Sequence, residues 1–329
     1  MRLQTSAPTR IDLAGGTIDI WPLYLFHAGA QTINAAISIR ARARIDSRSD
    51  SRVVLRSEDT NRTVEVDDWR ALKDDYSLRL LSLLVYFFEV GGITLTTSSE
   101  SPAGAGIAGS SALNVAVCAA LSEWKREHYE PEALLQLAMN VEAQTIKVPT
   151  GLQDYRPALY GGIAALELDP DGVRRVPLDV DASELERRIA LCYTGEPRNS
   201  GTNNWEITKK HIDGDTHVFD CFERIRDTAV GMREALTRGD WDRVGRAIAE
   251  EWDNRKRLAP GVTTPAIEDL ISRAMQAGAT AAKVCGAGGG GCMFCYGPPN
   301  RREAIREALA AGGARLLDYR FERDGLTRG

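Results

Sequence analysis

Apolar and polar side chains alternate most clearly over residues 31–45 of the chain. This period of two predicts a long strand with one face in the core and the other face half-exposed. The polar face carries Asn34 and a row of three arginines, Arg40, Arg42 and Arg44. Such a row is commonly a solvated strand face, although it could also meet a phosphate group of a substrate.

Similar patterns divide the rest of the chain into shorter strands and helices. Apolar or β-branched runs predict strands at 2–6, 52–56, 93–97, 160–168 and 189–193, and a strand after the glycines of 283–296. Helical spacing predicts helices at 77–90, from 110 onward, at 131–149, in runs between 214 and 277, and at 302–311. Residues 194–214 are polar and are predicted to form a long loop. Because strands and helices alternate unevenly, the expected fold class is α+β.

Length and one polar interval suggest where the chain divides. A chain of 329 residues corresponds to about two domains at roughly 150 residues each. The interval 170–186 is polar and rich in aspartate, which is typical of a boundary. We therefore expect an N-terminal domain over residues 1–183 and a C-terminal domain over residues 184–329.

Composition argues against several function classes. The formal net charge of −5 disfavours a nucleic-acid partner, since such proteins usually carry a basic excess. No run approaches the roughly 18 apolar residues of a membrane helix, and the first residues lack the apolar core of a signal peptide. A cytoplasmic protein with no membrane partner is therefore expected. The six cysteines are expected to be buried free thiols, and Cys292 and Cys295 should face opposite sides of a strand.

A glycine-rich stretch over residues 101–111 joins a predicted strand to a predicted helix. Its three spaced glycines would let backbone amides approach an anion, and the following helix adds free N–H groups and its positive dipole end. The hydroxyls of Ser110 and Ser111 could hold phosphate or magnesium. The Gly-Lys-Ser/Thr of a Walker loop does not follow. The alternative is an ordinary strand-to-helix turn capped by serine.

A second glycine cluster occupies residues 283–291. Gly286, Gly288 and Gly291 formally satisfy the dinucleotide fingerprint, but that motif requires a helix after the glycines, and a strand-like segment follows here. The cluster is better interpreted as a hairpin between two strands whose backbone packs closely on a ligand or on the first glycine loop.

Two carboxylates between these clusters are candidates for chemistry. Glu142 shares the inward-facing stripe of its helix with Leu135 and Ala138, where a carboxylate is costly unless it is paired or binds a metal. A helix phase shifted by one position would instead move Glu142 off the stripe. Asp154 lies in a turn and could be either a functional carboxylate or an ordinary turn residue.

The N-terminal segment carries further charged residues. Arg10 and Asp12 fall on the same side of an extended stretch, and Asp19 follows the pair Gly15-Gly16. A local ion pair followed by a turn would explain these residues without any function.

In their order and spacing, three of these motifs resemble the GHMP kinase superfamily, named for galacto-, homoserine, mevalonate and phosphomevalonate kinases. Residues 7–19 (APTRIDLAGGTID) are similar to the first family motif, residues 102–112 to the phosphate loop, and residues 283–291 to the third motif. Within the superfamily, the first motif and residues 148–155 (VPTGLQDY) are most similar to kinases of heptose 7-phosphate. The kinase part of fucokinases is the next most similar in these motifs.

The resemblance implies a two-domain GHMP kinase fold, with a ribosomal S5 domain 2-like N-terminal domain and a ferredoxin-like C-terminal domain. ATP and Mg²⁺ would bind in the cleft between the domains. Asp154 would be the catalytic acid and Arg10 would lie near the transferred phosphate, while Glu142 and one of Ser110 and Ser111 would hold magnesium. The residues implied in nucleotide binding are Pro102, Gly104, Gly106, Ala108, Gly109, Ser110, Ser111, Gly288 and Gly289. Those implied in substrate binding are Asp12, Gly16, Asp19, Asn34 and Arg198.

Three departures from the family pattern concern this site. The phosphate loop has Ala108 and Gly109 where a glycine and a hydroxyl residue are usual. Tyr155 stands where related sugar kinases tend to have glutamine, and Thr17-Ile18 stand where an aromatic residue or a glycine is more usual. The last two changes are expected where the sugar would bind, which leaves the exact acceptor open.

The leading hypothesis is an ATP-dependent kinase of a sugar, with the anomeric hydroxyl of a heptose 7-phosphate as the first acceptor. The alternative is a fucokinase- or galactokinase-like enzyme that acts on an unphosphorylated sugar. An NAD-dependent oxidoreductase is disfavoured by the strand after the second glycine cluster, and a non-catalytic regulator by the intact Asp154 and Glu142. A small-molecule sugar or sugar phosphate is the expected partner, and a homodimer stays open.

Overall fold

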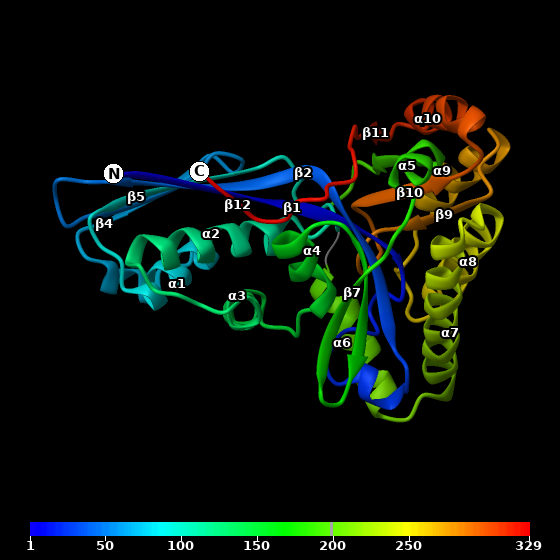
Figure 1. Ribbon diagram of the computed structural model, residues 1–329, viewed down its shortest axis with the longest axis horizontal. Helices are drawn as coiled ribbons and strands as arrows, with labels where there is room; N and C mark the ends of the chain where they lie inside the picture. The colour runs from blue at the N-terminus through cyan, green and yellow to red at the C-terminus, as the bar shows by residue number, and fades with distance from the viewer. Residues whose placement is uncertain (198–199) are drawn as a thin grey trace.

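Two sheets, each packed against helices, build the molecule (Figure 1). The structure is a computed structural model that describes residues 1–197 and 200–329, and the side chains of these ranges apart from 200–203. Both ends of the chain lie at the same sheet, because Gln4 and Gly329 exchange backbone hydrogen bonds of 3.0 and 2.9 Å.

The first sheet is built mainly from the N-terminal half. Its strands are β1 (Arg2–Ala14), β2 (Gln31–Ser47), β3 (Val53–Ser57), β4 (Arg62–Val66), β5 (Ile93–Ser99), β6 (Ile163–Asp169), β7 (Gly172–Pro177) and β12 (Thr327–Arg328). β2 organises this sheet, because it spans 17 residues and pairs with β1 along one side. On its other side β2 pairs with β6 through its first part and with β5 through its second part. The predicted long strand over residues 31–45 is confirmed.

Helices cover one face of the first sheet (Figure 1). They are α1 (Arg79–Phe88), α2 (Gly109–Lys125), α3 (Pro131–Ile146) and α4 (Tyr155–Tyr160), and the connections include the 3₁₀ turns η1 (Leu23–Phe26), η2 (Trp69–Asp74) and η3 (Leu152–Asp154). α2 packs on β1 and β2. Small buried residues of α2, such as Ala112, Ala116 and Ala120, let the helix approach the sheet closely. Thr5 Oγ1 donates a 2.7 Å hydrogen bond to the Ala116 carbonyl, which fixes α2 against β1.

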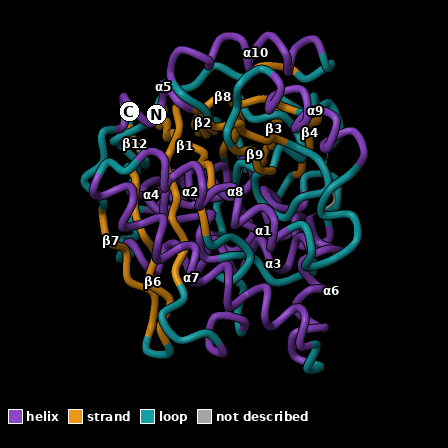
Figure 2. Tube along the Cα trace, turned by 90° about the vertical axis from the view of Figure 1, so that its right-hand side faces the viewer, coloured by secondary structure: helices purple, strands orange, loops and turns teal. Residues whose placement is uncertain are grey.

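The second sheet carries the C-terminal half. Its strands are β8 (Ile189–Tyr193), β9 (Ala281–Val284), β10 (Cys292–Tyr296) and β11 (Arg315–Leu316), in the order β11-β8-β10-β9. Its helices are α5 (Ala182–Arg188), α6 (Ser200–Ile212), α7 (Thr216–Arg238), α8 (Trp241–Arg255), α9 (Pro265–Gln276) and α10 (Arg302–Ala311), with the 3₁₀ turn η4 (Pro299–Arg301). In both views α10 lies at the outer edge of the molecule beside this sheet (Figure 1, Figure 2). Across the described ranges, no helix is long and apolar enough to cross a bilayer.

Alternate residues of β10 face two different cores. Cys292 and Phe294 belong to the core that includes Ile248 of α8, whereas Met293 and Cys295 belong to the other core. The predicted opposite orientation of Cys292 and Cys295 is therefore confirmed. The described cysteines are all buried and form no disulfide with one another.

β1 is longer than the pattern predicted. The strand expected over residues 2–6 continues past Pro8 to Ala14. Proline cannot donate to the ladder of a sheet, and the register of β1 against β2 shifts between Pro8 and Thr9. This irregularity accommodates the proline, so the glycine-broken first motif begins inside a strand.

Two other predicted elements also differ in the structure. The loop predicted over 194–214 contains the helix α6. Its apolar pattern is weak because Ile207 is buried whereas Trp205 and Ile212 are exposed. The strand predicted from residue 160 begins only at Ile163, because residue 160 still ends α4 and two glycines with positive φ intervene.

The arginine row of β2 is engaged within the protein. Arg40 donates to the Gly325 carbonyl at 2.7 Å, Arg42 pairs with Glu100 at 2.6 Å, and Arg44 pairs with Asp46 at 2.9 Å. The structure therefore favours the interpretation of this row as a salt-bridged strand face over a phosphate-binding role.

The expected domain boundary at 183/184 falls within α5. This helix lies between β7 of the first sheet and β8 of the second. The last residues of the chain return to the first sheet, where β12 pairs with β1 and the Glu322 N–H donates to Ala36 at 2.9 Å. Residues 184–329 therefore contribute to both sheets, and the exact division stays a prediction.

Candidate active site

The first glycine loop connects β5 to α2 and lines a cleft of about 330 Å³. Ala108 precedes α2 in the left-handed conformation, with φ 60°, and forms no side-chain cap. The first amide groups of α2 therefore stay available to a ligand, and the helix dipole favours an anion there. Gly109 is also required, because a Cβ there would lie 2.8 Å from the Ser101 side chain. All the predicted residues of this loop line the cleft: Pro102, Gly104, Gly106, Ala108, Gly109, Ser110 and Ser111.

Glu142 lies on the inward face of α3, as its spacing predicted. Its Oε2 atom accepts a 3.0 Å hydrogen bond from Ser111 Oγ and a 2.7 Å bond from the Tyr155 hydroxyl. Burial raises the pKa of Glu142, and the bond from Tyr155 opposes that shift. Glu142, Ser110 and Ser111 all line the cleft, so carboxylate and hydroxyl oxygens converge there. Tyr155 was expected beside the sugar, but it is fully buried and supports Glu142 instead.

Arg10 joins Asp154 to the first glycine loop. Its guanidinium donates to Asp154 through Nε at 3.1 Å and through Nη2, and its Nη1 donates to the Gly106 carbonyl at 2.9 Å. Burial alone would lower the pKa of Arg10, but the carboxylates of Asp154 and Asp12 raise it overall. The guanidinium therefore remains a fixed positive charge beside the partly exposed Asp154.

A second cavity of about 30 Å³ adjoins the cleft. Gly151, Asp154 and Asn204 line both cavities, so the Asp154 carboxylate stands where the two meet. A hydroxyl group that enters the smaller cavity would therefore meet a phosphoryl group in the cleft at Asp154, while a cavity of this size leaves the rest of an acceptor molecule outside it. The remaining lining residues of the smaller cavity are Arg10, Thr17, Asp19, Ile20, Gln153, Arg255, Gly286 and Ala287.

Several buried oxygens at this smaller cavity lack protein partners. Asp19 Oδ2 accepts a 2.9 Å bond from the Gln153 amide, but Asp19 Oδ1 has no partner among the described residues. Gln153 Oε1 and Asn204 Oδ1, on two other lining residues, are likewise unpartnered within the part of the chain that the structure describes. Asn34 Oδ1 also has no partner there, but Asn34 does not line this cavity. Burial, and then the charge of Asp154, raises the pKa of Asp19 to about 6. These oxygens would be satisfied by a ligand that donates hydrogen bonds.

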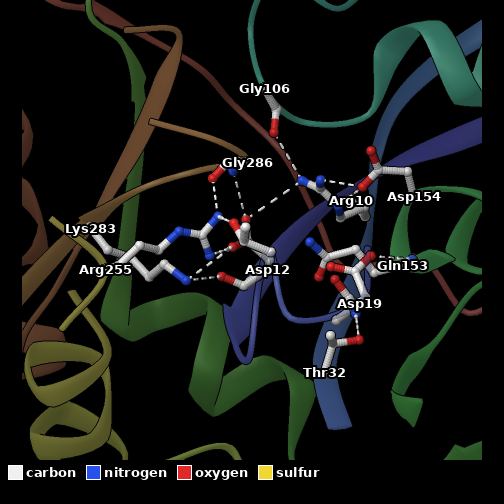
Figure 3. A network of polar contacts seen from close by, with 12 residues as sticks. Arg10, Asp12, Asp19, Thr32, Gly106, Gln153, Asp154, Arg255, Lys283 and Gly286 are labelled. Atoms are coloured by element: carbon white, nitrogen blue, oxygen red, sulfur yellow. Dashed lines mark hydrogen bonds and ion pairs between the residues drawn. The ribbon is translucent and has the colours of Figure 1, made fainter. Parts of the chain in front are cut away.

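Asp12 was predicted to contact substrate, but it is fully buried and lines neither cavity. Its carboxylate accepts 3.0 Å bonds from the Gly286 amide and from Lys283 Nζ, and it lies 3.3 Å from Arg255 Nη1 (Figure 3). Burial alone would raise the pKa of Asp12, but Lys283, Arg10 and Arg255 hold it well below its ordinary value. The structure therefore places Asp12 in a charge network behind the site.

The third motif forms the predicted hairpin between β9 and β10, which pair antiparallel. The hairpin packs on the first glycine loop, because the Cys292 amide donates a 2.6 Å bond to the Ala105 carbonyl. Gly288 and Gly289 contact Val262, whose carbonyl accepts a 2.7 Å bond from the Gly289 amide. Neither of these two glycines lines the cleft, so their contact with nucleotide stays a prediction.

The other predicted substrate residues differ in their surroundings. Gly16 packs on Arg255, since a Cβ on Gly16 would lie 2.0 Å from Arg255 Nη1. Asn34 lies opposite Asp12 in the ladder of β1 and β2, and its amide donates a 2.8 Å bond to Thr32 Oγ1. Arg198 lies outside the described residues. Sequence reasoning did not find Arg255 as a lining residue, because it belongs to no glycine motif.

Two family profiles match the chain, one in each half. The profile described as GHMP kinases N terminal domain matches residues 70–162, and the profile described as GHMP kinases C terminal matches residues 232–315. The chain belongs to the GHMP kinases. It is therefore an ATP-dependent phosphotransferase whose acceptor is an alcohol group.

Individual relatives extend over the whole chain. The D-glycero-alpha-D-manno-heptose 7-phosphate kinase of Campylobacter jejuni is 29% identical over 98% of both chains. A mevalonate kinase of Thermococcus sibiricus is 26% identical over 99% of this chain and 98% of its own. The crystal structure of a D-glycero-D-manno-heptose 1-phosphate kinase from Bacteroides thetaiotaomicron is 25% identical and covers 99% of this chain and 98% of its own, with a TM-score of 0.80. The predicted two-domain GHMP kinase fold is thereby confirmed.

Proposed function

We propose that this kinase transfers the γ-phosphoryl group of ATP to a hydroxyl group of a sugar. The observation that carries the proposal is a set of oxygens on residues that line the smaller cavity and have no partner among the described residues, namely Asp19 Oδ1, Gln153 Oε1 and Asn204 Oδ1. A buried polar atom left unpaired is costly, so a molecule that donates several O–H groups would be bound favourably. A pyranose meets this requirement, whereas mevalonate has few hydroxyl groups.

We further propose the anomeric hydroxyl of a heptose 7-phosphate as the first acceptor. The first motif and residues 148–155 support this acceptor, as do the two heptose phosphate kinases among the relatives. Arg10 and Arg255 line the smaller cavity, but both already form ion pairs within the protein. The 7-phosphate would therefore extend beyond this cavity, and an unphosphorylated sugar is the alternative.

The geometry supports a role for each group in the transfer. Amides of the first glycine loop and of the start of α2 would bind the phosphates of ATP. Asp154 would orient the attacking hydroxyl and accept its proton as the new O–P bond forms and the bond to ADP breaks. Arg10 would neutralise charge on the transferred group. Because it also donates hydrogen bonds to Asp154 and to the Gly106 carbonyl, it would keep the base at a fixed position relative to the first glycine loop.

Magnesium fits the oxygens of Glu142, Ser110 and Ser111, because the ion prefers few protein oxygens together with phosphate and water. It would neutralise charge on the ATP phosphates. We expect Glu142→Gln to raise the magnesium concentration for half-maximal activity about 10- to 100-fold. The variant should also melt at a higher temperature without ligand, since burial disfavours the carboxylate.

Magnesium titrations of ATP consumption and thermal melts would measure both effects. Glu123→Gln, at a more exposed position of α2, is the matched control and should change neither. A magnesium requirement that is the same in Glu142→Gln and in the wild type would remove Glu142 from the metal site.

The acceptor is identified by measuring ADP release with a panel of sugars and sugar phosphates, with mevalonate as the comparison. Phosphorus and proton NMR of the product then locate the new phosphate. Coupling between this phosphate and the anomeric proton would support the proposal. A phosphate on another carbon would exclude anomeric transfer, and turnover with mevalonate alone would exclude a sugar acceptor.

A further inference from the structure

A network of buried charges lies behind the active site and joins the two sheets (Figure 3). Lys283 of β9 is fully buried, and its Nζ atom donates to the Asp12 carbonyl at 2.9 Å and to Asp12 Oδ2 at 3.0 Å. The same ammonium forms a close ion pair with Glu251 of α8, which is also fully buried. Glu251 in turn lies 3.1 Å from Arg255 Nη1.

This network continues directly into the groups assigned to phosphoryl transfer. Asp12 Oδ1 lies 3.6 Å from Arg10 Nη1, and the same oxygen accepts the Gly286 amide of the third motif. Arg10 then bonds Asp154 and the Gly106 carbonyl of the first glycine loop. Asp12 is therefore the point at which the catalytic pair, the first loop and the third motif are held together.

Stability alone is a poor explanation for Lys283. Removing two opposite charges from water is costly, and well-packed apolar residues often serve a core equally well. The six charged groups of the network balance: the cations are Arg10, Arg255 and Lys283, and the carboxylates are Asp12, Asp154 and Glu251. A balanced network of this kind can fix one orientation of Asp12, which an apolar core could not do.

We propose that Lys283 is a positioning residue for phosphoryl transfer: it anchors Asp12, and through Asp12 it aligns Arg10 with Asp154. Glu251 compensates the buried charge of Lys283 and contributes to stability, without itself aligning Arg10. This inference rests on the proposed roles of Arg10 and Asp154 in the kinase reaction.

Two single variants separate positioning from stability. Lys283→Met removes one of the two cations that pair with Glu251, and Glu251→Gln removes one of the two carboxylates that pair with Lys283, so both should lower the melting temperature by similar amounts. Only Lys283→Met removes a direct contact of Asp12, namely the two bonds from Nζ, whereas the bonds from the Gly286 amide and Arg255 remain in both variants. We expect kcat to fall about 10- to 100-fold in Lys283→Met, with the KM for ATP changed less than about threefold, while Glu251→Gln keeps kcat within about threefold of the wild type.

The double variant Lys283→Met/Glu251→Gln sharpens the comparison, because it restores the charge balance of the network. Its melting temperature should recover towards that of the wild type, whereas kcat should stay as low as in Lys283→Met. The matched control is Lys256→Met/Asp253→Asn, which removes an ion pair on the surface at the end of α8, and should change neither quantity.

The pH dependence of kcat provides a second readout that a purely structural role would not move. Asp12 faces Arg10 on β1, Lys283 on β9 and Arg255 on α8. Glu251 of α8 pairs with both Lys283 and Arg255. Lys283 contributes the largest of the attractions that lower the pKa of Asp12. In Lys283→Met and in the double variant, Asp12 should therefore take up a proton at higher pH, and the acid limb of kcat should shift upward.

The outcomes distinguish this inference from the proposed function. A wild-type protein that consumes no ATP with any sugar would reject the proposed function, whatever the variants do. If the wild type is active and kcat follows the melting temperature across all three variants, Lys283 acts only through stability and the inference is overturned. Failure of both the single and the double Lys283 variants to fold would overturn it equally.

Discussion

Asp154→Asn is expected to lower kcat about 100- to 10,000-fold, which is the usual range for the loss of a positioned base. Asp154 lies at the junction of the two cavities, where an attacking hydroxyl would meet the transferred phosphoryl group. Asparagine can still accept a hydrogen bond from Arg10, but it cannot take the proton of the acceptor. The effect should therefore fall on kcat, and the KM for ATP should change little.

The stability of this variant gives an independent check on the ion pair with Arg10. A bond to a charged group contributes about 1.5–3 kcal/mol, and partial exposure of Asp154 reduces this contribution. We expect a loss of about 1 kcal/mol in the free energy of unfolding, measured by denaturant titration. Asp169→Asn, at the exposed end of β6, should alter neither activity nor stability. Near-normal turnover of purified Asp154→Asn on its acceptor would show that another group takes the proton.

The sequence predicted those parts of the site that depend on residues close to one another along the chain. Helical spacing alone placed Glu142 on an inward-facing stripe, and the structure confirms it. The glycine spacing and the following helix likewise predicted the loop that lines the cleft. Both predictions depend on residues within about two turns of one another, where periodicity determines which side chains share a face.

The parts that the sequence did not predict depend on contacts between distant segments. Lys283 meets Asp12 across a separation of 271 residues, and no local pattern indicates which buried cation pairs with which carboxylate. Tyr155 follows Asp154 directly, yet α4 turns its hydroxyl towards Glu142 rather than towards the acceptor. α6 was missed for a different reason, because a helix with one buried contact face and several polar residues lacks a clear apolar period.

Asp19→Asn is expected to change activity and stability in opposite directions. The loss of the carboxylate should lower kcat/KM for the acceptor about 10- to 200-fold, the range for one hydrogen bond to a charged group. The same change should stabilise the ligand-free protein at pH 8, because the buried carboxylate is ionised there and its Oδ1 atom has no partner among the described residues. Lower activity together with higher stability would indicate that Asp19 binds the acceptor at the expense of stability. If the role of Asp19 were purely structural, the variant would lose both activity and stability.

The sign and the pH range of the stability effect follow from the pKa of Asp19, which burial raises from 3.8 to about 6. A carboxyl group whose pKa is higher in the folded state destabilises the fold when it is ionised. This penalty is present above about pH 6 and absent below about pH 4, and at about 1.4 kcal/mol for each unit it amounts to about 1–3 kcal/mol. The Asp19→Asn variant should therefore be more stable than the wild type at pH 8 and equally stable at pH 4, as measured by denaturant titration.

The pH dependence of kcat/KM for the acceptor should also report the ionisation of Asp19. In the wild type, kcat/KM for the acceptor should fall as the pH decreases through about 6, because protonated Asp19 accepts hydrogen bonds less well from hydroxyl groups. Asp19→Asn should lack this acid limb, while Asp171→Asn, in the exposed turn between β6 and β7, should retain it. An acid limb that persists unchanged in Asp19→Asn would assign the ionisation to another group and leave Asp19 with a structural role only. Loss of the limb together with higher stability at pH 8 would place Asp19 against the bound acceptor.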